Sequence, residues 1–177
     1  MSKVVELHKT GTSPKLGIQI ITCSTSRYKE LKIGKKTEDT SGNIIEQLVS
    51  SNGHRVEGRE LIPDSRPMIR RAVQAALASK HVDVILITGG TGVSPRDITI
   101  ESVGSLFQKE ISGFGELFRK ISYEKIGSAA MLTRASAGLV KGKAIFCLPG
   151  SPDAVQTALE SLILPEIGHL IKVSREH

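Results

Sequence analysis

The sequence of 177 residues contains no tryptophan, and its four phenylalanines and two tyrosines make up only 3% of the chain. Proteins that bind single-stranded nucleic acid usually stack the bases on aromatic rings. The scarcity of such rings therefore argues against a nucleic-acid-binding surface. The most basic stretch, residues 27–36, carries five cations but also Glu30, and it is more typical of a solvated loop than of a nucleic-acid patch.

Cysteine is scarce as well. Only Cys23 and Cys147 occur, each within an apolar run, which indicates buried reduced thiols rather than a disulfide framework. The five histidines show no metal-ligand spacing, so a zinc site is not supported. The sequence has no charged-then-apolar leader and no apolar run of 18 residues, so neither secretion nor a membrane span is expected. These absences favour a cytoplasmic protein.

The composition that is present, 39% hydrophobic and 24% charged, is typical of a globular protein. At about 150 residues per domain, the length favours one domain over residues 16–177, preceded by a polar arm at residues 1–15. Lysine and arginine exceed the acidic residues, 24 against 18, which gives a net charge of +6. A positive balance of this kind attracts anionic ligands such as phosphates.

Strand and helix patterns alternate along the chain. Strands are expected at 16–22, 54–62, 82–87 and 144–148; the run at 82–87 is aliphatic apart from Asp83, as in a strand buried on both faces. Helices are expected at 43–51, from about residue 66 with Pro67 in the first turn, at 98–109, at 116–125, and after Ser151 with a break or kink at Pro165. Residues 24–40 are expected to form a long loop. The alternation predicts a three-layer α/β/α fold with a mainly parallel central sheet.

A glycine-rich segment follows the most apolar strand directly. Residues 88–97 read Thr-Gly-Gly-Thr-Gly-Val-Ser-Pro-Arg-Asp and precede a predicted helix, the position where open α/β sheets bind ligands. The glycines allow backbone N–H groups to surround an anion, and the hydroxyl groups and the arginine add donors. The segment fits neither a Walker A loop nor the Gly-x-Gly-x-x-Gly fingerprint. The candidate ligand-binding residues here are Thr88, Gly89, Gly90, Thr91, Gly92, Ser94 and Arg96.

Two aspartates follow consecutive predicted strands. Asp64 and Asp97 each stand at the start of a predicted helix, where a carboxylate can simply cap the helix. Folding of a parallel sheet would also bring both to the same edge, beside the glycine loop. Since Mg²⁺ takes one or two carboxylates and leaves its other positions to phosphate oxygens and water, the pair is a plausible magnesium site. Both interpretations stand at the level of sequence.

Two further glycine turns open predicted helices. Pro149, Gly150 and Ser151 follow the last predicted strand, and the helix start behind them could hold an anion or be an ordinary capped terminus. Glu116 closes a Gly-Phe-Gly-Glu segment, where it could orient a ligand or complement the helix dipole.

The order of these motifs resembles the MogA/MoaB-type molybdenum cofactor biosynthesis proteins, a domain also found in gephyrin-like proteins. The resemblance covers essentially residues 16–170, and the motif Thr-Gly-Gly-Thr-Gly with the following Arg-Asp is its most specific part. Ser-Thr-Ser-Arg-Tyr in the first loop and Thr-Ile-Glu-Ser at 99–102 look more like MoaB than MogA. The matching blocks lie at 24–27, 38–42, 62–64, 88–99, 113–116 and 148–151.

What the resemblance implies is adenylylation of molybdopterin: its terminal phosphate attacks the α-phosphorus of MgATP and expels pyrophosphate. Asp64 and Asp97 correspond to the two functional aspartates of the family, with Mg²⁺ as cofactor. The resemblance further implies a homo-trimer or a hexamer and possible hand-over of product to a metal-inserting MoeA-like protein. The substrate-binding residues it implies are Ser24, Thr25, Ser41, Gly42, Thr88, Gly89, Gly90, Thr91, Gly92, Ser94, Arg96, Glu116, Pro149, Gly150 and Ser151.

A second hypothesis belongs to a different functional class. A molybdopterin-binding or scaffold protein of the same pathway could keep the pocket without efficient catalysis, and the MoaB-like motifs motivate this alternative. Release of pyrophosphate from ATP and molybdopterin discriminates between the two, and the presence of both Asp64 and Asp97 favours the enzyme.

Overall fold

The computed structural model describes residues 15–176, so the polar arm expected at residues 1–15 lies outside the described residues apart from Lys15. Within this range the strands form one six-stranded sheet in the order β2-β1-β3-β6-β5-β4. The strands are β1 (Gly17–Cys23), β2 (Arg55–Ile62), β3 (Val84–Thr88), β4 (Lys109–Glu110), β5 (Ser136–Val140) and β6 (Lys143–Leu148).

The pairing of these strands confirms the mainly parallel sheet. β2, β1, β3 and β6 run parallel to one another, whereas β5 is antiparallel to β6 and β4 is antiparallel to β5. From β1 the chain moves to one side to form β2 and then to the other side to form β3. The strand order therefore reverses beside β1, and a crevice opens there at the carboxyl ends of the strands, where doubly wound sheets bind their ligands.

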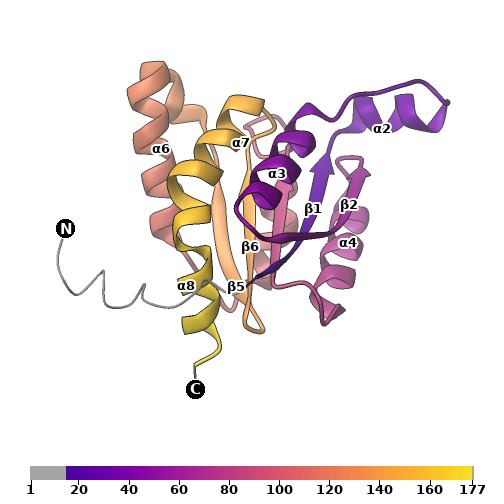
Figure 1. The fold of residues 1–177 in the computed structure, drawn as a ribbon. Helices are drawn as coiled ribbons and strands as arrows, with labels where there is room; N and C mark the ends of the chain where they lie inside the picture. Colours follow the sequence, from indigo (N-terminus) through magenta and orange to yellow (C-terminus); the bar gives the residue numbers. More distant parts are fainter. Residues whose placement is uncertain (1–14, 177) are drawn as a thin grey trace.

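Helices cover both faces of the sheet, as Figure 1 shows. One face carries α3 (Thr40–Ser51), α6 (Ser112–Ile126), α7 (Pro152–Ala158) and α8 (Leu164–Ser174); the other carries α4 (Arg66–Ala78) and α5 (Thr99–Val103). Successive strand residues point to opposite faces, so Leu86 packs into the first core and Ile87 into the second. This double burial explains the nearly continuous aliphatic run that the sequence shows.

Residues 24–40 are not the continuous loop expected from the sequence, because they contain the helix α2 (Thr25–Lys32). Ser24 begins this helix by accepting a hydrogen bond from the Arg27 N–H. No residue of α2 is buried, so no apolar stripe marks the helix in the sequence. Figure 1 shows α2 beyond the carboxyl end of β1, projecting from the body of the sheet.

The helix expected at residues 98–109 is also wrong in its extent. α5 ends at Val103, a 3-10 turn η1 (Gly104–Leu106) follows, and the chain then forms β4. The Phe107 ring packs against Gly138 of β5, where an added Cβ would lie 2.3 Å from the ring. Pairing with β5, a strand that the sequence reasoning missed, therefore ends the helix early.

The helix expected at residues 43–51 begins three residues earlier, at Thr40. Asp39 is the capping residue, and its carboxylate accepts a hydrogen bond from the Gly42 N–H at 3.0 Å. Asp caps a helix about as well as Ser or Thr. Asp39 takes this role because it directly precedes the first helical residue. Ser41 is left free for another role at the site described below.

A π-helical turn, and no break, precedes Pro165 in the helical segment after Ser151. α7 runs into a π-helical turn, η3 (Leu159–Ile163), before α8 begins, and Pro165 lies in the first turn of α8. Because proline has no N–H, the regular helical hydrogen bond cannot form at this position, and a wider turn precedes it.

His54 holds the residue that precedes β1 through a hydrogen bond. Its ring is buried, and its Nδ1 accepts a hydrogen bond from the Leu16 N–H at 3.4 Å. Burial lowers the pKa of His54 from its usual value of 6.5. The unfolded chain therefore takes up the proton more readily, so the stability from neutral His54 is present above about pH 6.5 and is lost as the pH falls towards the lowered pKa.

We expect His54→Asn, which keeps an acceptor near Nδ1 without titrating, to lose part of this pH dependence. Urea unfolding at about pH 7.5 and about pH 5.5 measures the difference in free energy of unfolding between the two conditions. The wild-type protein should lose more stability at the lower pH than the variant. Equal losses in both proteins would contradict the role given to His54.

Candidate functional site

A cleft of about 450 Å³ opens at the carboxyl ends of β1, β3 and β6. Nine of the residues singled out in the sequence line it, together with five others from the end of β1, from α2 and from the segment before β5. The lining residues are Cys23, Ser24, Arg27, Gly89, Gly90, Thr91, Gly92, Asp97, Leu132, Thr133, Arg134, Pro149, Gly150 and Ser151.

The floor of the cleft is made by backbone segments that lie unusually close together. Gly89 has a φ of +93°, and an added Cβ there would lie 2.2 Å from the carbonyl oxygen of Cys23. On its other side, a Cβ added to Gly150 would lie 3.2 Å from the Gly89 Cα, and the Gly89 N–H donates to the Leu148 carbonyl at 3.0 Å. Only glycine fits this contact, so the ends of three strands meet at Gly89.

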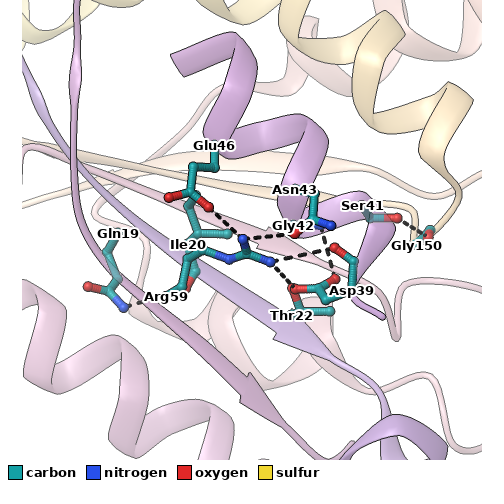
Figure 2. Close-up of polar contacts among 10 residues, drawn as sticks. All are labelled: Gln19, Ile20, Thr22, Asp39, Ser41, Gly42, Asn43, Glu46, Arg59 and Gly150. Carbon is teal, nitrogen blue, oxygen red and sulfur yellow. Dashed lines mark hydrogen bonds and ion pairs between the residues drawn. The ribbon is translucent and has the colours of Figure 1, made fainter. Parts of the chain in front are cut away.

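Three buried hydroxyl groups fix this backbone arrangement. Thr88 donates to the Pro149 carbonyl at 2.8 Å, and Thr99 donates to the Gly89 carbonyl at the same distance. Ser41 donates to the Gly150 carbonyl at 2.8 Å, as Figure 2 shows. Thr88 and Ser41 therefore support the cleft from behind and do not line it.

Asp97 lies at the cleft and does not cap the helix that follows it. Its Oδ2 accepts a hydrogen bond from the Ser94 N–H at 2.9 Å and lies 2.7 Å from the position of a Cβ added to Gly92. The residue preceding α5 is Ile98, which makes no side-chain capping bond. The capping interpretation of Asp97 is therefore wrong, and its carboxylate is held against the glycine loop.

Asp64 does not cap its following helix either. Ser65 precedes α4 and makes no side-chain capping bond. The Asp64 Oδ2 instead accepts from the Thr25 N–H at 3.0 Å and from the Thr25 hydroxyl at 2.7 Å, at the first turn of α2. Its Oδ1 faces the glycine loop, 2.7 Å from the position of a Cβ added to Gly90. The two carboxylates thus flank the same loop, as the sequence predicted.

Two arginines line the cleft that the sequence reasoning did not include among the site residues. Arg27 comes from α2, and its guanidinium makes no hydrogen bond or ion pair with any residue in the range 15–176. Arg134 donates to the Gly92 carbonyl at 3.1 Å and forms an ion pair with Glu101. Burial raises the pKa of Glu101, but the hydrogen bond from Arg134, a backbone hydrogen bond and the charges of Arg134 and Arg66 together outweigh it, so the pKa lies below the usual value.

Cys23 lines the cleft as a neutral thiol. Burial raises its pKa to about 12, with a smaller opposing effect of its hydrogen bond with Thr99. The thiolate is the nucleophilic form of cysteine, so Cys23 is not a nucleophile at neutral pH. Both cysteines are buried and free, as expected from the sequence.

Behind the cleft, a cluster around Asp39 holds the start of α3 against the sheet (Figure 2). The Asp39 carboxylate accepts from the Thr22 hydroxyl at 2.7 Å and from Arg59 at 3.0 Å. Arg59 also donates to Glu46 and Asn43 on α3. Partial burial lowers the pKa of Arg59, but hydrogen bonds to the two carboxylates outweigh it and raise the pKa. The cluster orients α3 so that its first turn contacts the Gly150 turn.

The remaining predicted residues lie at or beyond the edge of the cleft. Gly42 allows the Asp39 carboxylate to lie close to the backbone of α3, since an added Cβ would lie 2.1 Å from that carboxylate. Ser94 and Arg96 are exposed on the loop beside Asp97. Glu116 is exposed on α6 and is not among the lining residues, so the cleft does not bring it together with the two aspartates.

The acidic groups fit a magnesium site in which the protein supplies only two ligands. No group of three or more His, Cys, Asp or Glu side chains that could hold a metal ion occurs within the described part of the chain. Asp64 and Asp97 supply two carboxylates at the glycine loop. That number suits Mg²⁺ bound jointly with substrate phosphates, and it is too small for a dedicated all-protein metal site.

These features define the class of the protein. A glycine loop, two carboxylates that flank it and an unpaired arginine lie together at the switch point of a doubly wound sheet. Such a cleft belongs to an α/β domain that binds a phosphate-bearing ligand. Within residues 15–176, no helix is long and apolar enough to cross a membrane.

Comparison with known proteins identifies the family. Residues 19–169 match the family described as "Probable molybdopterin binding domain", and this chain belongs to that family. Molybdenum cofactor biosynthesis protein B of Bacillus cereus is 44% identical over 164 residues, which cover 92% of this chain and 93% of that protein. The family predicted from the sequence motifs is thus confirmed.

Two further relatives bear on the function and the fold. A probable molybdopterin adenylyltransferase of Methanocaldococcus jannaschii is 41% identical over 157 residues, covering 89% of this chain and 93% of that protein. The crystal structure of the tungsten cofactor synthesizing protein MoaB from Pyrococcus furiosus superposes with a TM-score of 0.81 at 41% identity, over 92% of this chain and 99% of that chain.

The close contact at Gly89 can be tested against a glycine without such a contact. Gly34 has a φ of +73° with nothing within 4 Å of an added Cβ, so Gly34→Ala should cost about 1–2 kcal/mol from backbone strain alone. Gly89→Ala adds the overlap with the Cys23 carbonyl, so its free energy of unfolding should fall clearly further. Urea denaturation measures both, and equal losses would contradict the packing described.

Proposed function

We propose that this chain is a molybdopterin adenylyltransferase of molybdenum cofactor biosynthesis. The observation that carries the proposal is the glycine loop, which Asp64 and Asp97 flank, at a cleft that Arg27 lines without a partner. The name of the Methanocaldococcus jannaschii relative supports the same activity. The reaction transfers the adenylyl group of ATP to the terminal phosphate of molybdopterin and releases pyrophosphate.

The reaction does not need a strong general base. A phosphate nucleophile is already ionised at neutral pH, so catalysis depends on alignment and on neutralising charge among several phosphates. The loop from Gly89 to Gly92 lines the cleft, and Arg134 fixes this loop through the Gly92 carbonyl. Arg27 is free to pair with phosphate oxygens. Cys23, held neutral by burial, takes no part as a nucleophile.

Asp64 and Asp97 are the residues that would hold Mg²⁺, which when bound with ATP offsets the negative charge of the phosphates. The Ser94 N–H and the Thr25 side chain orient these carboxylates through the hydrogen bonds described above. Each aspartate keeps one oxygen outside these bonds, which leaves it available to a ligand.

One observation favours the alternative of a binding or scaffold protein. Asp64 already anchors α2 through two hydrogen bonds with Thr25, and this role needs no catalysis. Release of pyrophosphate from MgATP and purified molybdopterin separates the two functions. An enzyme releases it in multiple turnovers, whereas a scaffold binds molybdopterin without doing so.

The assembly and the setting belong to the same proposal. Residues 16–177 act as one molybdopterin-binding domain, in a cytoplasmic homo-trimer or hexamer that passes its product to a metal-inserting MoeA-like protein. Large apolar side chains on and after α6 support an assembly, because exposed apolar groups that gather on one segment mark interaction surfaces. They are Leu117, Tyr123, Ile126, Leu132 and Met131, the last 81% exposed.

The first prediction concerns the carboxylates. Asp64→Asn and Asp97→Asn keep the shape of each side chain and remove its charge, so each should slow adenylylation by about 10²-fold or more, roughly 3 kcal/mol of barrier. Folding should survive, since Asn can still accept the bonds from Thr25 and Ser94. Initial rates of pyrophosphate release measure the effect, with Glu124→Gln on α6 as a charge-matched control. Two folded variants with wild-type rates would remove the catalytic assignment.

The second prediction concerns Arg27. A hydrogen bond to a charged group contributes about 1.5–3 kcal/mol, so Arg27→Met should raise KM for ATP by about 10-fold or more. Lys29→Met removes a positive charge from the same exposed helix without touching the cleft, and it should change KM little. Equal effects of the two substitutions would show that only the overall charge of α2 matters.

A further inference from the structure

The projecting helix α2 and the residue after it carry two large apolar side chains that are exposed to solvent. Leu31 is 52% exposed, and Ile33, which directly follows the helix, is 69% exposed. No residue of α2 is buried, so neither side chain is part of a core. Exposed apolar groups that gather on one segment and are rimmed by polar residues mark an interaction surface. The function proposed above does not use these two side chains.

Four lysines flank the two apolar side chains. All four lysines are exposed, and none of them forms an ion pair within residues 15–176. The acidic residue among them, Glu30, accepts a hydrogen bond from the Thr37 hydroxyl at 3.0 Å. The result is a strongly positive surface with an apolar centre. We refer to it as the α2 surface, made of Lys29, Leu31, Lys32, Ile33, Lys35 and Lys36.

The end of α2 is held by its own backbone, which gives the α2 surface a defined shape. Gly34 has a φ of +73°, and its N–H donates to the Leu31 carbonyl at 3.1 Å. The Lys35 N–H donates to the Glu30 carbonyl at 3.0 Å. These two bonds form the Schellman motif that ends many helices. The apolar side chains therefore project from a fixed backbone, which lowers the entropy that binding costs.

The α2 surface lies beside the opening of the cleft. Arg27 on the same helix lines the cleft. Leu31 follows four residues later, and residues four apart are neighbours on one face of a helix. The first turn of α2 is anchored at the cleft by the hydrogen bonds between Asp64 and Thr25. A molecule that covers Leu31 is therefore next to the site where the cleft takes up its ligand.

We propose that the α2 surface docks the acidic face of a second protein, one that exchanges the phosphate-bearing ligand with the cleft. The nature of that ligand rests on the proposed function, whereas the docking itself does not. Charge complementarity selects the partner, because the unpaired lysines favour a face rich in carboxylates. Leu31 and Ile33 supply the apolar anchors that interfaces place at their centre.

Other occupants fit the α2 surface less well. A second copy of this chain has the same net charge of +6 and the same lysines, so two α2 surfaces repel each other. A membrane surface requires an amphipathic helix with an apolar face, and α2 has only eight residues and no apolar stripe. Single-stranded nucleic acid requires free aromatic rings, and the Lys32 ammonium lies 5.5 Å from the centroid of the Tyr28 ring.

The experiment measures the binding of two fluorescent peptides to the full chain by anisotropy. The first is a helical peptide in which glutamates surround a stripe of leucines. The second has serine in place of each leucine and keeps the charge. Wild-type protein should bind the leucine peptide about 10-fold more tightly, because only this peptide buries apolar surface against the protein. Raising NaCl from about 50 to about 200 mM should weaken the binding of both peptides.

One pair of variants tests the apolar centre. Leu31→Gln combined with Ile33→Gln should weaken the leucine peptide by about 10-fold and leave the serine peptide within about 2-fold. Val173→Gln on α8 replaces an aliphatic side chain that is 48% exposed, and it should change neither affinity by more than about 2-fold. These side chains are exposed, so folding is retained.

A second pair of variants tests the charge. Lys29→Met combined with Lys32→Met should weaken both peptides by about 5-fold, as expected for the loss of two exposed ion pairs. Lys80→Met combined with Lys120→Met removes the same charge from exposed positions elsewhere, and it should have little effect. Equal losses in the two double variants would show that the peptides respond only to the net charge of the protein, and this would overturn the proposal.

Three further outcomes overturn the docking of an acidic protein. The first is equal affinity of the wild type for the two peptides. The second is binding of the wild type, but not of the Leu31→Gln and Ile33→Gln variant, to phosphatidylglycerol vesicles, which would assign the α2 surface to a membrane. The third is a lower molecular mass of that variant in light scattering, which would assign the surface to a second copy of the chain.

Pyrophosphate release from MgATP and molybdopterin, measured without peptide, separates this proposal from the proposed function. The Leu31→Gln and Ile33→Gln variant should release pyrophosphate at the wild-type rate, since neither residue lines the cleft. Release by the wild type together with equal binding of the two peptides overturns the docking and leaves the proposed function. Selective binding of the leucine peptide without any release overturns the proposed function and leaves the docking surface.

Discussion

The close approach of backbone to backbone at Gly89 is the constraint on which the site depends. A side chain on Gly89 would overlap the Cys23 carbonyl, and one on Gly150 would press on Gly89, so the ends of β1, β3 and β6 meet only because these positions lack a Cβ. Hydroxyl groups of Thr88, Ser41 and Thr99 then hold the joined segments through backbone carbonyls. The backbone of the loop is thereby fixed before any ligand arrives, which lowers the entropy lost on binding.

Much of this arrangement could be predicted from the sequence, because it follows from local patterns. The aliphatic strand before Thr88 and the glycines after it located the cleft, and the two strand-end aspartates fell beside it. What was missed depends on contacts between distant segments. Arg134 reaches the Gly92 carbonyl across 42 residues, and no local pattern marks it. α2 has no apolar stripe, so its helix and the position of Arg27 were not visible either.

The strand β5 was missed in the sequence for a different reason. Its sequence, Ser-Ala-Gly-Leu-Val, lacks a clear β-branched pattern, and its glycine leaves space for the ring of Phe107. A signal was nevertheless present in the turn that follows. Lys141 and Gly142 both have positive φ, as a two-residue hairpin turn requires, and they join β5 to β6. Turn chemistry would have found the hairpin where strand propensity did not.

The hydrogen bonds between Asp64 and Thr25 couple the site to the projecting helix. The same carboxylate borders the glycine loop and anchors the first turn of α2, the helix that carries Arg27. A cation or phosphate that changes the orientation of Asp64 also changes the free energy with which α2 is attached. By thermodynamic reciprocity, whatever steadies α2 alters the affinity of the carboxylate for its ligand by the same factor. Occupancy of the cleft and the placement of Arg27 are therefore a single linked equilibrium.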